Sequence, residues 1–90
     1  MSRNEKINIV LLFTPQELEE FKTIIQVFGE DACLLSESEN IDKAEKERYV
    51  REAMICYKVL RALGDDNLRS EEEFISILRE RSGVNIADIE

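Results

Sequence analysis

Apolar residues are densest between residues 48 and 63, and their spacing predicts a helix. Within RYVREAMICYKVLRAL, apolar residues recur at intervals of three and four, at Tyr49, Ala53, Cys56, Leu60 and Leu63. Other apolar positions extend this surface most of the way round the helix and leave a narrow polar strip. A helix of this kind is normally buried on more than one side. We therefore expect a central helix over Lys43–Leu63, covered by its own chain, by a second copy, or by both.

The segment before it has the residues that begin and end a helix. Thr14 can cap a helix over Pro15–Phe28, since proline is favoured at the first helical position and Glu17 completes a capping box. Gly29 is expected to end this helix. One apolar stripe runs along it, at Leu18, Phe21, Ile24, Ile25 and Phe28.

Similar residues delimit the other two helices. Asp42 can cap the central helix, and Gly64 can end it. Ser70 can cap a third helix over Glu71–Ser82, which Gly83 would end. The following tail, VNIADIE, is expected to form either an edge strand or one more helical turn.

Two short segments favour strands. Ile7–Phe13, INIVLLF, is rich in β-branched residues and short for a buried helix, so we expect a strand there. Asp31–Ser36 is either a helical turn or a second strand over Ala32–Leu35. The predicted fold is a single helix-dominated α+β domain over residues 1–90, with three helices, one or two N-terminal strands and a frayed segment at residues 1–6. The alternative is an all-α fold.

Composition narrows the range of partners. The 90 residues include 20 acidic and 12 basic ones, for a net charge of -8. This charge argues against binding to nucleic acid or to an anionic membrane. The chain has neither an apolar run of roughly 18 residues nor a cleavage site for a signal peptide. Two cysteines in this context are typical of free thiols in a cytoplasmic protein.

The sequence offers little catalytic chemistry. It contains no histidine, which removes the commonest general base and most transition-metal sites. Cys33 and Cys56 lie among apolar residues and are expected to be small buried side chains rather than nucleophiles. No glycine-rich phosphate loop follows the predicted first strand. We therefore expect no enzyme activity, cofactor or metal.

Residues 77–90, ILRERSGVNIADIE, resemble the first helix and turn of helix-turn-helix repressors. That resemblance implies a recognition helix directly afterwards, where this sequence ends. Since such a motif reads the major groove through its second helix, we expect a helix with a tail rather than direct nucleic-acid binding.

Acidic residues give one positive indication of function. Glu30 to Glu47 contains seven acids and two lysines. If Glu37, Glu39 and Asp42 form a negative face, its partner would be basic. The chain would then act as an antagonist of a nucleic-acid-binding protein or of a toxin.

The preferred hypothesis is a small acidic regulator or inhibitor that binds proteins and associates as a homodimer. The back of the central helix, at Ile55, Val59 and Ala62, would form the dimer contact, because two short helices and a strand cannot cover it. A third hypothesis, a small enzyme or ligand-binding domain, would require a concave pocket with convergent polar groups.

Overall fold

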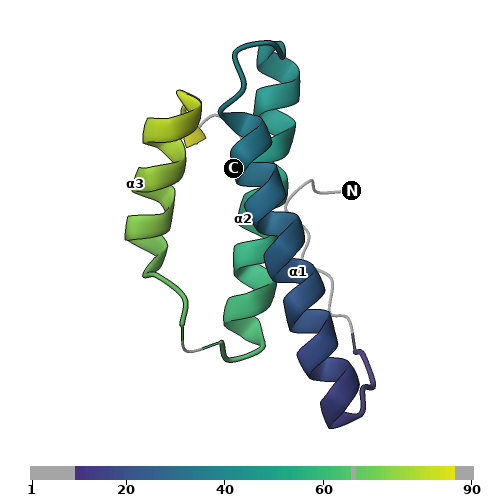
Figure 1. Cartoon of the computed structure of the whole chain (residues 1–90). Helices are drawn as coiled ribbons and strands as arrows, with labels where there is room; N and C mark the ends of the chain where they lie inside the picture. Colours follow the sequence, from purple (N-terminus) through teal and green to yellow (C-terminus); the bar gives the residue numbers. More distant parts are fainter. Residues whose placement is uncertain (1–9, 66, 87–90) are drawn as a thin grey trace, which may run out of the picture.

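The computed structural model describes residues 10–65 and 67–86, which form three helices (Figure 1). The helices are α1 (Pro15–Ser36), α2 (Lys43–Ala62) and α3 (Glu71–Ser82). α1 and α2 lie side by side and antiparallel, and α3 runs back along α2. The prediction of three helices is confirmed. The all-α alternative fits, and the α+β class is wrong for the described residues.

Both predicted strands fail where the structure describes them. Residues 10–13 of the expected Ile7–Phe13 strand form neither strand nor helix, and residues 7–9 lie outside the described part of the chain. Ala32–Leu35 belongs to the last turns of α1. The two segments therefore do not pair, and Asp31–Ser36 takes the helical conformation that its sequence left open.

Gly29 does not end α1, which continues for seven more residues. It lies inside the helix, and a Cβ atom placed on it would be 3.0 Å from the Cβ of Cys56. Glycine is therefore required here by close packing against α2 rather than by a left-handed backbone. The prediction that Gly29 ends the helix was wrong, because glycine is used both at helix ends and where two helices pack closely.

The predicted helix starts are confirmed. The Thr14 hydroxyl accepts a hydrogen bond from the Glu17 amide at 3.2 Å, and the Thr14 amide donates to Glu17 Oε1 at 2.9 Å. Asp42 caps α2 and Ser70 caps α3 in the same way, each through the amide three residues on. These bonds satisfy amides that a helix start leaves without partners.

The predicted ends of α2 and α3 are also confirmed. Gly64 and Gly83 have φ values of 78° and 74°, a left-handed conformation that glycine adopts without strain. The Gly83 amide donates a hydrogen bond to the carbonyl of Arg79, which closes the last turn of α3.

The most deeply buried apolar cluster lies at one end of the molecule. There the end of α1, the first half of α2, the end of α3 and the following tail meet, through Ala32, Val50, Ala53, Leu78, Val84 and Ile86. Ile86 is only 2% exposed and Val84 only 7%, so residues 84–86, which follow α3, belong to the core. None of the described helices combines the length and apolar composition needed to cross a membrane.

Candidate interaction surfaces

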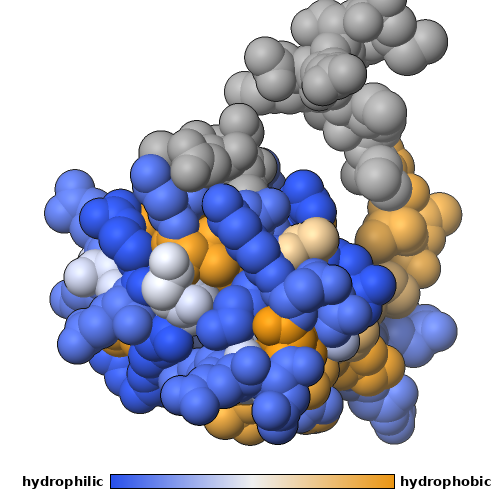
Figure 2. Space-filling view, turned by 90° about the horizontal axis from the view of Figure 1, so that it is seen from above, coloured by the Kyte–Doolittle hydropathy of each residue, from blue (hydrophilic) through white to orange (hydrophobic). Residues whose placement is uncertain are grey.

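The side of α1 turned away from α2 carries large apolar side chains in contact with solvent. These residues, which we call the α1 outer face, are Ile24, Val27, Phe28, Leu34 and Leu35. Their exposed fractions range from 45% for Leu35 to 64% for Ile24. Their spacing places them on one side of a helix. Figure 2 shows apolar surface open to solvent on the side of the molecule where Figure 1 places α1.

Small residues on the opposite side of α1 explain this arrangement. Gly29, Ala32 and Ser36 follow one another at spacings of three and four, and the last two are buried. The Ser36 hydroxyl donates a hydrogen bond to the Cys33 carbonyl at 2.6 Å, so its burial leaves no polar atom unsatisfied. Small side chains let this part of α1 approach α2 closely, whereas the five residues of the α1 outer face remain exposed.

The apolar stripe proposed from sequence is therefore divided between two environments. Leu18, Phe21 and Ile25 are half-buried, whereas Ile24 and Phe28 are exposed. Apolar periodicity could not separate the two groups. The spacing of the small residues could have indicated which side of α1 packs against α2.

Apolar exposure continues into the segment before α1. Val10, Leu11 and Leu12 are exposed, and Phe13 stacks on Phe21 of α1 with ring centroids 5.1 Å apart. Together with the α1 outer face, these side chains make nine large apolar residues that are exposed to water. Such areas on a small protein commonly mark contact with another molecule.

A second candidate surface is a groove between α2 and α3, with a volume of about 550 Å³. Apolar side chains from both helices line it, namely Met54, Ile55, Tyr57, Phe74 and Ile75. Its charged lining comprises three cations, Arg51, Lys58 and Arg61, and one carboxylate, Glu71.

Three contacts around Tyr57 and Arg61 hold α3 beside α2. The ring of Tyr57 stacks on that of Phe74, with centroids 4.6 Å apart and planes 13° apart. The Tyr57 hydroxyl donates a hydrogen bond to the Arg69 carbonyl just before α3. Arg61 and Glu71 form an ion pair at 3.2 Å, with both side chains more than half exposed. An exposed pair of this kind contributes little stability, so the aromatic stack and the tyrosine bond carry most of this contact.

The residues predicted to mediate self-association do not share one environment. Ile55 is exposed and lines the groove, Val59 is half-buried, and Ala62 is exposed. Ile55 is thus the one large, well-exposed apolar side chain in the proposed set, whereas the α1 outer face has five.

Two of the three acids in the proposed negative face have structural roles. Glu37 lies 3.6 Å from Arg81 in an ion pair that joins the end of α1 to α3. Asp42 accepts the Glu45 amide at 2.8 Å as the cap of α2. Glu39 lies between them in the linker and is exposed. Glu37 and Asp42 therefore stabilise the helices as well as carrying negative charge.

Both cysteines are free thiols. Burial raises the pKa of Cys33, an effect that Arg81 partly opposes, and burial followed by the nearby charge of Glu52 raises the pKa of Cys56. A raised pKa keeps a thiol protonated at neutral pH, when it is a poor nucleophile and a poor metal ligand. Among the described residues, no cluster of three or more potential ligands could hold a metal ion.

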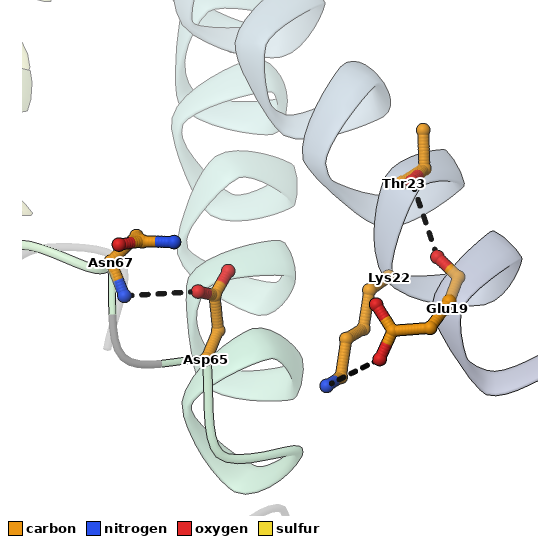
Figure 3. A network of polar contacts seen from close by, with 5 residues as sticks. All are labelled: Glu19, Lys22, Thr23, Asp65 and Asn67. Carbon is orange, nitrogen blue, oxygen red and sulfur yellow. Dashed lines mark hydrogen bonds and ion pairs between the residues drawn. The ribbon is translucent and has the colours of Figure 1, made fainter. Parts of the chain in front are cut away.

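Polar side chains elsewhere bond to near neighbours in the sequence. Figure 3 shows Glu19 pairing with Lys22 at 3.4 Å and accepting the Thr23 hydroxyl through its carbonyl, all within α1. The Asn67 amide likewise donates to Asp65 in the turn after α2. These contacts stabilise local structure and do not bring reactive groups from different helices together.

Comparison with known proteins reveals no relationship, since no protein-family model, curated protein or solved structure matches this chain.

Proposed function

We propose that this protein is a small, non-enzymatic protein-binding regulator or inhibitor that acts as a homodimer, and that the α1 outer face forms the dimer contact. The observation that supports this proposal is the exposure of five large apolar side chains along one side of a single helix. Burying them against a second copy would remove apolar surface from water, which is the main driving force of association.

A two-fold dimer suits this face. α1 has 22 residues and is therefore about 33 Å long, enough for two copies to pack antiparallel over several turns. In a two-fold contact the same face is used by both copies. The segment at residues 10–13 would lie beside this contact and could extend it.

Asp31 lies among the apolar residues of this face, three residues after Phe28 and three before Leu34. It is exposed in the single chain, and pairing would partly desolvate it. Asp31→Asn should therefore strengthen association. A substitution that removes charge from a surface unrelated to pairing would have no such effect.

Sedimentation equilibrium at micromolar concentrations tests the proposal. The unmodified chain should be a dimer, and Ile24→Asp/Phe28→Asp should be a folded monomer, since neither side chain is buried in the single chain. The matched control is Thr23→Asp/Gln26→Asp, which adds the same charges at exposed positions outside the α1 outer face. Circular dichroism of each variant checks that the helices persist.

Val59→Asp distinguishes this contact from the back of α2. If Val59→Asp alone yields monomer while Ile24→Asp/Phe28→Asp remains dimeric, the dimer uses α2 and the assignment to α1 is wrong. A monomeric unmodified chain at these concentrations would refute self-association altogether.

A further inference from the structure

We infer that the groove between α2 and α3 is a binding site for an acidic amphipathic helix of a partner protein. This site is separate from the proposed dimer contact, because its lining comes from α2 and α3 whereas the dimer contact comes from α1. The groove therefore remains open to a partner whether or not the chain pairs through the α1 outer face.

The charge of the groove is opposite to that of the protein. The whole chain has 20 acidic and 12 basic residues, yet the groove is lined by three cations and one carboxylate. Arg61 is paired with that carboxylate, Glu71. Within the described part of the chain, Arg51 and Lys58 have no ion pair or side-chain hydrogen bond, so both can receive carboxylates from a partner.

The apolar lining indicates that the partner also has an apolar side. Met54, Phe74 and Ile75 are only partly buried and Ile55 is exposed, and all four line the groove from two helices. A helix laid between them would cover these side chains with its own apolar residues, spaced by three and four positions. Its carboxylates would then lie on the side facing α2.

The cations are spaced to suit a helix rather than a single charged group. Arg51 and Arg61 are ten residues apart on α2, which is about 15 Å along the axis, or nearly three turns. Lys58 lies between them, seven residues after Arg51. A partner helix of similar length, with two acids two turns apart, could meet Arg51 and Lys58 together, since Arg61 is held by Glu71.

A display library of helical peptides provides a direct test. Each peptide would carry three apolar positions varied among Leu, Ile, Met and Phe, flanked by Glu, Gln or Lys. Selection on the unmodified protein should enrich the Glu-flanked peptides. General attraction to a chain of charge -8 would enrich the Lys-flanked peptides instead. Preference for glutamate therefore indicates local positive charge, which the charge-reversal variants below test.

Charge-reversal variants test whether Arg51 and Lys58 supply this positive charge. Arg51→Glu/Lys58→Glu should weaken binding of a selected Glu-flanked peptide, measured by fluorescence anisotropy, by about tenfold or more. The control, Lys43→Glu/Arg79→Glu, makes the same change in net charge at exposed positions outside the groove and should bind almost as the unmodified protein does. Ile55→Asp should abolish binding, because it places a charge in the apolar lining.

Three results would overturn the inference. One is that Glu-flanked peptides are enriched no more on the unmodified protein than on the Arg51→Glu/Lys58→Glu variant. Another is equal enrichment of Glu- and Lys-flanked peptides. The third is a dimer of the unmodified protein that the same double substitution converts to monomer, which would make a second copy of this chain the occupant of the groove.

Discussion

Gly29 of α1 lies so close to Cys56 of α2 that a Cβ atom on the glycine would be 3.0 Å from the Cβ of the cysteine. This distance is shorter than ordinary carbon–carbon contact, and the cysteine Cβ is fixed to its backbone. Gly29→Val should therefore force the helices apart and lower the free energy of unfolding by about 2 kcal/mol. Urea denaturation followed by circular dichroism would measure the change.

Gln26→Val is the control for that substitution. It places the same side chain in the same helix at an exposed position, where the lower helix propensity of valine costs about 0.5 kcal/mol. If the two valine variants lost equal stability, close packing at Gly29 would not be the cause.

Ile86 holds residues 84–86, which follow α3, in the core. Ile86→Ala should lower the free energy of unfolding by about 3 kcal/mol, because it leaves a cavity beside Leu78 and Val84. Leu12→Ala, at a position that is 92% exposed, should change stability by less than about 0.5 kcal/mol. Chemical denaturation of both variants tests this prediction, and a small effect at Ile86 would show that residues 84–86 are loosely held.

The stability that the capping box of α1 contributes should decrease in acid. Hydrogen bonds from the Thr14 backbone and then its side chain lower the pKa of Glu17 below its ordinary value of 4.5. The box therefore adds stability above pH 4.5, and this contribution is lost as the pH falls through the folded-state pKa. Thr14→Ala should raise the pKa of Glu17 only part of the way toward 4.5, because the bond from the backbone amide remains, whereas Thr14→Ser should preserve the pKa. An NMR titration of Glu17 that showed the same pKa in all three proteins would contradict the assignment.

The stability that the two buried thiols contribute should decrease in base. Burial raises the pKa of Cys33 and of Cys56 above the ordinary 9.0, so the folded state favours the protonated form. Their contribution to stability is present below pH 9.0 and is lost as the pH rises beyond it. Stability should fall less steeply above pH 9.0 in Cys33→Ala/Cys56→Ala than in the unmodified chain. Parallel pH profiles from chemical denaturation would exclude a role for the thiols.

Tests of the acidic linker should take its structural roles into account. Glu39→Lys changes charge without removing a cap or an ion pair and should not alter stability; if the linker binds a basic partner, as the antagonist hypothesis requires, this substitution should also slow that association. Asp42→Ala removes the cap of α2 and should cost about 1 kcal/mol. Stopped-flow binding and denaturation would separate the two effects. An unchanged association rate in Glu39→Lys would argue that the linker charge only solvates the surface.

The sequence by itself determined where the three helices begin and where two of them end. Caps such as Thr14 and Ser70 act on amides three residues away, and Gly64 and Gly83 act on the turn that precedes them. Such interactions are complete within a few residues, so they can be deduced from local spacing. The dense apolar pattern of the central helix was equally informative, and five of its residues are buried in the structure.

Only the tertiary structure decided the length of α1, the side it exposes and the groove between α2 and α3. Gly29 could end a helix or allow close packing, and the presence of Cys56 opposite it determined which. Ile24 and Ile25 are identical residues next to each other in the sequence. Ile24 is nevertheless exposed and Ile25 half-buried, because α2 covers only one side of α1. The groove arises because side chains from two helices, such as Met54 and Phe74, are brought together by folding. These features depend on contacts between residues far apart in the chain, and apolar periodicity within one segment does not reveal them.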